Sequence, residues 1–141
     1  MDPLLRFFIE HWALSGAFLT LVVVFLVNEW RHSAMGVPNL DPQQLVNLLN
    51  HSNGVAVDTR SAIRFQQGHI IGAINLPQKE FATRLNLLNK YKTKPIILVC
   101  AKGLDAPKMT KVLVTNGFTQ VYFLTNGMDG WIASGMPIVK Q

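Results

Sequence analysis

Residues 95–105 read PIILVCAKGLD, and this stretch decides the fold class. Its apolar run IILVCA is typical of a central parallel strand that is covered on both faces. A helix is predicted to begin shortly afterwards, near Ala106 and Pro107. In open α/β sheets, ligands bind beyond the carboxyl ends of the strands. Cys100 stands at such an end, and it is therefore the first candidate for a functional residue.

Strands and helices alternate on both sides of this stretch. Bounded apolar segments predict further strands, at residues 54–59, 70–76 and 121–124. Apolar residues at helical spacing, with capping and stop residues around them, predict helices or helical turns at residues 41–49, 61–65, 81–91, 106–116 and 129–134. This alternation predicts one α/β domain with a mostly parallel central sheet and helices on both faces.

The start of the chain differs from the rest in composition. Residues 12–27 contain no ionisable side chain, and Trp12 and Trp30 bracket the run. A helix from one tryptophan to the other spans ~27 Å, close to the ~30 Å of a hydrocarbon core. We predict a membrane anchor at residues 1–31 with a transmembrane helix at about 12–30. A linker at 32–40 and a domain at 41–141 follow.

The apolar run has two other interpretations. A buried core helix has a similar length, and the uncharged run is slightly shorter than the ~20 residues of a typical span. A cleavable signal peptide needs a basic start, whereas here Asp2 and Glu10 accompany a single Arg6. The pair of bracketing tryptophans favours the uncleaved membrane helix.

Composition limits both the class of protein and its location. Charged residues make up 15% and hydrophobic residues 49% of the chain, which excludes a solvated disordered protein. The single cysteine excludes a disulfide scaffold and a multi-cysteine zinc site, and it suits a reducing compartment. Residues 33–141 hold 11 Lys/Arg and 5 Asp/Glu, which suits an anionic cytoplasmic leaflet. We therefore expect a single-pass protein of the inner (cytoplasmic) membrane with its domain in the cytoplasm.

The loop after Cys100 has the length and position of an anion-binding site. A short connection from a strand to a helix N-terminus can direct several backbone N–H groups to one point. A cysteine sulfur there is stabilised as the reactive thiolate, and Lys102 adds a positive charge. The competing interpretation is an inert core cysteine, since free cysteines are among the most buried residues. The loop lacks the ending of a Walker motif.

Longer segments around the loop resemble the rhodanese-like sulfurtransferases. The resemblance lies in Cys100 to Asp105 with Gly103 third after the cysteine, in VDTRSAIRFQQGHIIGAINLP at residues 57–77, and in VYFLTNGMDGWIASGMP at residues 121–137. It covers about residues 40–139, and the anchor makes the chain similar to small membrane-tethered rhodaneses of bacteria. The resemblance implies a rhodanese-like three-layer sandwich without a cofactor or metal.

The same resemblance implies a sulfur-transfer reaction. Cys100 would attack a sulfane sulfur donor, become a persulfide and pass the sulfur to an acceptor nucleophile. The backbone amides of the loop would bind the substrate or the persulfide anion, and the loop consists of Ala101, Lys102, Gly103, Leu104 and Asp105. The expected partners are a small-molecule or protein persulfide donor, a thiol or protein sulfur acceptor, and the lipid bilayer.

The loop departs from the family pattern at two positions. The family often has Arg after the cysteine, where this chain has Ala101, and Arg, Ser or Thr at the last loop position, where it has Asp105. A carboxylate discourages dianionic donors, so a persulfide on glutathione or on a protein is favoured over thiosulfate. Asp105 is also expected to be a helix N-cap.

The missing arginines leave alternatives open. One is a catalytically weak rhodanese-fold docking module for a membrane protein complex, with a membrane protein as its partner. Another is a cysteine phosphatase or arsenate reductase, which the short loop and the absence of a loop arginine disfavour.

Other residues of the resembling segments are expected to be structural. Asp58 and Arg60 are predicted to form an ion pair that braces the active-site loop, His69 to bond to backbone in a turn, and Trp131 to anchor the core. Five lysines, at 90, 92, 94, 108 and 111, are interpreted as a solvated face, with a membrane-facing role as the second reading. Nucleic-acid binding is not expected, because no aromatic residues are interleaved with these charges.

Overall fold

A parallel sheet of five strands forms the centre of the domain in the computed structural model, which describes residues 2–34 and 36–141. The strand order is β1-β5-β4-β2-β3, and every neighbouring pair is parallel. The strands are β1 (Asn39–Leu40), β2 (Val55–Asp58), β3 (Ile74–Asn75), β4 (Ile96–Val99) and β5 (Val121–Leu124). The predicted central strand, β4, lies in the middle of the sheet, and all four of its residues are buried.

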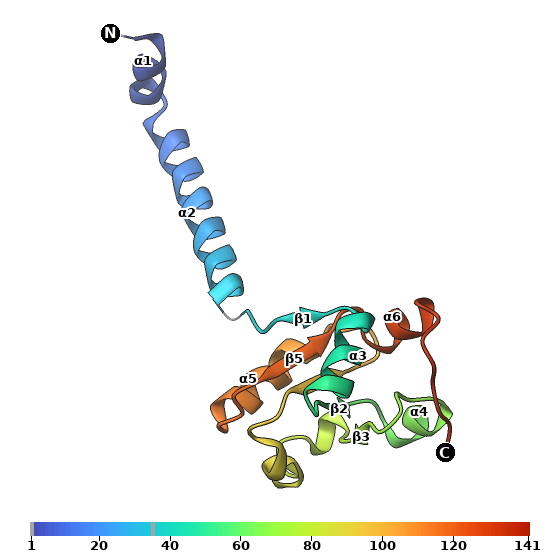
Figure 1. Ribbon diagram of the computed structural model, residues 1–141. Helices are drawn as coiled ribbons and strands as arrows, with labels where there is room; N and C mark the ends of the chain where they lie inside the picture. The colour runs from blue at the N-terminus through green and yellow to red at the C-terminus, as the bar shows by residue number, and fades with distance from the viewer. Residues whose placement is uncertain (1, 35) are drawn as a thin grey trace. The chain divides into compact units, whose positions relative to one another are not determined.

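Helices cover both faces of this sheet, as predicted (Figure 1). On one face, α5 (Ala106–Thr115) and the 3-10 helices η1 (Gln78–Glu80) and η2 (Leu85–Tyr91) accompany a cluster that includes Leu98, Leu113 and Phe118. On the other, α3 (Pro42–His51) and α6 (Gly127–Ala133) contribute to a cluster that includes Leu45, Ile97 and Trp131. The three-layer α/β arrangement with a parallel central sheet that was expected from the sequence is therefore confirmed.

The first helix of the domain shows how local sequence sets a boundary. The side chain of Asp41 accepts a hydrogen bond from the Gln44 amide at 2.8 Å. In return, the Asp41 amide donates to the Gln44 side chain at 2.9 Å, which completes a capping box. Pro42 occupies the first turn, where its missing N–H is not needed. The predicted start of α3 at this point is confirmed.

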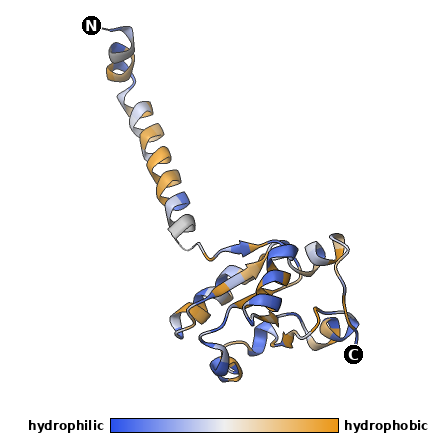
Figure 2. Cartoon of the chain, in the orientation of Figure 1, coloured by the Kyte–Doolittle hydropathy of each residue, from blue (hydrophilic) through white to orange (hydrophobic). Residues whose placement is uncertain are grey.

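The N-terminal 36 residues form a separate compact unit from residues 37–141. This unit contains α1 (Pro3–Glu10), which the sequence analysis did not predict, and α2 (Trp12–Ala34). The segment Trp12–Trp30 is long and apolar enough to cross a membrane, and none of it is buried against protein. Figure 2 shows the middle of α2 as a hydrophobic band.

The segment predicted as a linker, residues 32–40, contains ordered secondary structure at both ends. Helix α2 continues to Ala34, and Asn39 and Leu40 pair with Phe123 and Leu124 of β5. A two-residue strand leaves no periodic pattern in the sequence, and it forms only because β5 offers a free edge. Met35 lies outside the described residues.

Two further predictions differ from the structure. Of the predicted strand at residues 70–76, only Ile74–Asn75 pairs in the sheet. The predicted α-helix at 81–91 is replaced by η2, which starts at Leu85. Phe81 and Leu88 are nevertheless buried and Leu85 is half-buried, as their spacing required. The hydrophobic spacing identified the buried face correctly but did not distinguish α from 3-10 hydrogen bonding.

Candidate functional site

Cys100 follows the last residue of β4 directly, at the carboxyl edge of the sheet. Its side chain belongs to the core cluster that also holds Ala106, and only 6% of the residue is exposed. The backbone N–H of Gly103 donates a hydrogen bond to Cys100 Sγ at 2.8 Å. Gly103 has φ +81°, a conformation that favours glycine. The loop therefore folds back so that one backbone dipole points at the sulfur.

The start of α6 supports this loop. The Met128 amide donates to the Cys100 carbonyl oxygen at 2.8 Å, and the Asp129 amide donates to the Ala101 carbonyl oxygen at 3.1 Å. Gly127 lies against the Cys100 carbonyl group, and a Cβ on Gly127 would lie 2.1 Å from the Cys100 carbonyl oxygen. Both Asn126 and Gly127 have positive φ, of 57° and 54°.

The sequence analysis assigned no role to this support. Asn126 and Gly127 lie within the segment that carries the family resemblance, and an Asn-Gly pair is a sequence signal for positive φ. The Asn-Gly pair predicts a turn, but it does not predict that this turn contacts Cys100, because Asn126 and Cys100 are 26 positions apart in the sequence.

The five predicted substrate-binding residues all lie in the irregular loop between β4 and α5. Ala101 and Gly103 are half-buried, whereas Lys102, Leu104 and Asp105 are exposed. Leu104 is 79% exposed, an unusual position for a large apolar side chain. Within the described part of the chain, the amides of Lys102, Leu104 and Asp105 have no hydrogen-bond partner. These N–H groups are available to an anionic ligand.

Asp105 occupies the N-cap position of α5 but does not cap it. Its backbone has helical angles, with φ −90° and ψ −15°, and its side chain accepts no capping hydrogen bond. The expectation that Asp105 serves as an N-cap through its carboxylate is therefore wrong. A capping residue needs extended angles to turn its side chain toward the first-turn amides, and the loop does not provide them here.

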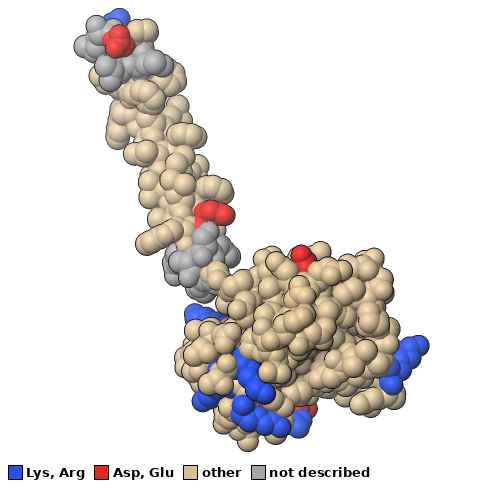
Figure 3. All heavy atoms as spheres, viewed as in Figure 1, with Lys and Arg blue, Asp and Glu red and all other residues tan. Residues whose placement is uncertain are grey.

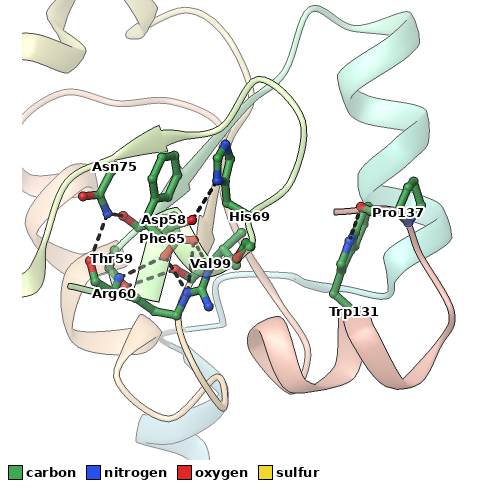
Figure 4. A network of polar contacts seen from close by, with 10 residues as sticks. Asp58, Thr59, Arg60, Phe65, His69, Asn75, Val99, Trp131 and Pro137 are labelled. Atoms are coloured by element: carbon green, nitrogen blue, oxygen red, sulfur yellow. Dashed lines mark hydrogen bonds and ion pairs between the residues drawn. The ribbon is translucent and has the colours of Figure 1, made fainter. Parts of the chain in front are cut away.

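The predicted ion pair between Asp58 and Arg60 is present (Figure 4). Arg60 Nη2 lies 2.7 Å from Asp58 Oδ2, and the Asp58 side chain is 1% exposed. Arg60 Nη2 also donates to the Gly68 carbonyl oxygen at 2.7 Å. The pair therefore braces the turn after α4 (Ala62–Gln67), not the Cys100 loop as predicted. The link to β4 comes instead from Thr59, whose amide donates to the Val99 carbonyl oxygen at 2.8 Å.

His69 and Trp131 have the structural roles that were predicted. His69 Nδ1 lies 2.8 Å from the Phe65 carbonyl oxygen, and the two rings stack with centroids 3.7 Å apart. Trp131 is 2% exposed, and its Nε1 donates to the Pro137 carbonyl oxygen at 2.9 Å. Figure 4 shows both side chains held by backbone carbonyls.

The sequence of the chain is similar to a known family and to individual proteins. A family model described as Rhodanese-like domain matches residues 41–134. The uncharacterized protein YibN of Escherichia coli is 33% identical over 141 residues, which cover 99% of each chain. Thiosulfate sulfurtransferase GlpE of Glaesserella parasuis is 30% identical over 100 residues, which cover 70% of this chain and 90% of GlpE.

The fold also matches solved structures. The crystal structure of a rhodanese-related protein from Thermoplasma volcanium superposes with a TM-score of 0.66. The match covers 74% of this chain and 99% of that protein, at 21% identity. At this identity the likeness concerns the fold alone.

Proposed function

The chain belongs to the rhodanese-like domain family, and from this premise we propose that it is a membrane-tethered sulfurtransferase that carries sulfane sulfur on Cys100. The family also contains thiosulfate sulfurtransferases to which this chain is distantly similar. The observation that carries the proposal is the hydrogen bond from the Gly103 amide to Cys100 Sγ at 2.8 Å. A backbone N–H donor stabilises a sulfur that bears negative charge, and the charged sulfur is the nucleophile.

The first step would load the sulfur. The Cys100 thiolate attacks the terminal sulfur of a donor persulfide, R–S–SH. A new S–S bond forms on Cys100, the S–S bond of the donor breaks, and the donor leaves as the thiolate R–S⁻ with the bonding electron pair. The outer sulfur of the Cys100 persulfide then releases its proton to water, and the available N–H groups of Lys102, Leu104 and Asp105 would stabilise the resulting anion.

The second step would transfer the sulfur from Cys100 to an acceptor. An acceptor thiol gives its proton to the outer sulfur of the Cys100 persulfide and attacks that sulfur as the thiolate. The acceptor becomes a persulfide, the S–S bond to Cys100 breaks, and the Cys100 thiolate is regenerated. The two half-reactions share one site, so the kinetics would be of the ping-pong type.

The exposed loop residues favour a persulfide donor over thiosulfate. Lys102 contributes the one cationic side chain between Ala101 and Asp105, and the exposed Asp105 carboxylate opposes it. A dianion gains little from such a site. Leu104 presents an apolar surface instead, 79% exposed, which suits a thiol carrier with apolar groups or a protein donor.

The membrane tether is supported by α2. The hydroxyl of Thr20 donates to the Gly16 carbonyl oxygen at 2.8 Å, so its polar group is satisfied within the helix. Trp12 and Trp30 stand at the ends of the apolar segment, where indole rings favour the interface. The basic domain and the single cysteine favour the inner membrane with the domain on its cytoplasmic side.

Mass spectrometry of the detergent-solubilised full chain tests the proposal. After incubation with glutathione persulfide and removal of the donor, Cys100 should carry one additional sulfur atom. A thiol acceptor should then remove it. The variant Cys100→Ser is the control, since it keeps a side chain of similar size without the nucleophile. An unmodified Cys100 in a folded sample would refute the sulfur-carrier function.

A second candidate function is a docking module that needs no sulfur chemistry. The observation that favours it is the combination of an exposed Leu104 with an Asp105 carboxylate at the position where the family often has Arg, Ser or Thr. If the domain is a docking module, Cys100→Ser should leave its cellular function unchanged, whereas Leu104→Ser should abolish that function. A sulfur carrier gives the opposite result for Cys100→Ser.

A further inference from the structure

The parallel sheet gives the domain two chemically different edges. All five strands run in one direction, so their amino ends share one edge, which we call the amino edge, and their carboxyl ends share the other. Cys100 follows the carboxyl end of β4. The chain enters the domain at the amino edge, because Pro38 precedes β1 and accepts a hydrogen bond from the Phe123 amide at 3.3 Å.

Three lysines lie at the amino edge immediately before β4. Lys90 and Lys94 both place their ammonium groups over the ring of Tyr91, at 5.0 Å and 5.8 Å from its centroid. The ammonium group of Lys92 lies 5.7 Å from the centroid of Phe118. The aromatic rings therefore hold three positive charges in one region. We call Lys90, Lys92 and Lys94 the lysine cluster.

No carboxylate neutralises this cluster. Between Phe81 and Leu104 the sequence contains no Asp or Glu. None of the three lysines forms an ion pair with any residue that the structure describes. Figure 3 shows Lys and Arg atoms gathered over the lower left of the domain, where Figure 1 places the end of α5 and the segment near residue 90.

The acidic residues of the domain lie elsewhere. All five follow or end a strand and so belong to the carboxyl side: Asp41, Asp58, Glu80, Asp105 and Asp129. The carboxyl edge therefore carries charges of both signs, whereas the amino edge is basic. This asymmetry gives the domain a preferred orientation in an electric field.

We propose that the lysine cluster binds the anionic headgroups of a lipid bilayer. The inference rests on the proposed membrane tether, which supplies the bilayer. Eight residues, 31–38, separate the end of the apolar segment at Trp30 from β1 in the sequence, and four of them belong to α2, so this connection reaches at most about 20 Å. The tether therefore keeps the amino edge near the bilayer, and the surface potential acts on a lysine that comes within the ~8 Å Debye length of the lipid.

Tyr91 adds a second feature suited to this partner. It is half-buried between two lysines, and tyrosine and lysine are both residues that favour the headgroup region. Docking through the amino edge turns the carboxyl edge away from the lipid. Cys100 then opens toward water, and the sulfur donor and acceptor are soluble molecules or soluble domains.

Lysine acylation on reconstituted full-length protein tests the docking. Vesicles of phosphatidylcholine alone are compared with an equal mixture of phosphatidylcholine and phosphatidylglycerol, with a reagent that does not cross the bilayer. On anionic vesicles the lysine cluster should react about fivefold more slowly, the ratio that one lysine-headgroup contact supports. High salt should restore the rate. Lys102, at the carboxyl edge, should react equally in both.

Hydrogen exchange provides a readout that does not depend on lysine chemistry. Amides of residues 89–94 should exchange more slowly on anionic than on zwitterionic vesicles. This slowing should be lost in Lys90→Gln/Lys92→Gln/Lys94→Gln and kept in the matched control Lys79→Gln/Lys108→Gln/Lys140→Gln. Unchanged exchange of β4 shows in each case that the domain is folded.

The outcomes separate the two proposals. A chain that floats with the vesicles but shows equal acylation and exchange on both lipids overturns the docking and leaves the tether intact. Slowing that extends equally to Lys102 also overturns it, because the contact would then not be specific to the amino edge. A chain that fails to float with the vesicles overturns the tether, and the docking fails with it.

Discussion

Gly127 and Cys100 are in contact through their backbones, so that a Cβ on Gly127 would lie 2.1 Å from the Cys100 carbonyl oxygen. The contact joins the start of α6 to the loop that follows Cys100, and the Met128 and Asp129 amides complete the attachment. Two segments therefore set the position of the Cys100 thiol: the loop that contains it, and the start of α6.

Gly127→Ala tests this contact. The added methyl group cannot fit without displacing the loop, and we expect a loss of about 3 kcal/mol in the free energy of unfolding. Gly135→Ala is the matched control, because Gly135 also has positive φ, of 70°, but no atom lies within 4 Å of its Cβ position. Its cost should be about 1 kcal/mol, from backbone strain alone. Equal losses in thermal unfolding would show that the close contact is unimportant.

Arg60→Met should destabilise the domain strongly. The substitution leaves the Asp58 carboxylate buried without its partner, and such a loss amounts to about 3 kcal/mol or more. Denaturant unfolding measures it. The control is Arg84→Met, which breaks the exposed pair with Glu80 and should cost below about 1 kcal/mol. Adding Asp58→Asn to Arg60→Met should recover part of the stability, and no recovery would mean that the unpaired charge is not the cause.

Asp105→Ala should change reactivity and not stability. The Asp105 side chain is exposed and caps no amide, so the free energy of unfolding should change by less than about 0.5 kcal/mol. Removal of its charge should raise the rate of Cys100 persulfide formation from thiosulfate about fivefold, because the repulsion of a dianion is relieved. The rate with an uncharged alkyl persulfide is the control and should stay the same. A stability loss well above the stated limit would restore the capping role.

Leu21→Arg should weaken membrane integration. Leu21 lies at the centre of the Trp12–Trp30 segment, where an arginine costs about 2.5 to 3.5 kcal/mol. The fraction of chain that stays in the membrane after an alkaline carbonate wash should fall. Asn28→Arg adds the same charge near the end of the segment, where the long side chain can reach the headgroups, and should have little effect. Equal behaviour of the two variants would contradict a spanning helix.

Most of the fold was predictable because its signals are local. The capping box at Asp41, the apolar run of β4 and the long apolar helix α2 each depend on residues close in sequence. Strand β1 and the 3-10 form of η2 were not predictable in the same way. Strand β1 has two residues and forms only because it pairs with β5. For η2, hydrophobic spacing does not specify whether the backbone hydrogen bonds follow the α or the 3-10 pattern.

The candidate site likewise has a part that local sequence predicts and a part that depends on tertiary contacts. The loop and its cysteine were found from the strand, loop and helix sequence around Cys100. The support from Gly127 and the attachment of Arg60 to Gly68 instead of the loop both depend on tertiary contacts. The failure of Asp105 to cap α5 depends on two backbone angles that the residue type does not determine.

Cys100 is the one cysteine of the chain. Oxidation of its thiol cannot end in a disulfide within the same molecule, which is the usual protection of redox-active thiols. A sulfenic acid formed there would have to be captured by a thiol from outside, such as glutathione, before further oxidation makes it irreversible. The working lifetime of the protein under oxidative stress should therefore follow the cellular supply of small thiols.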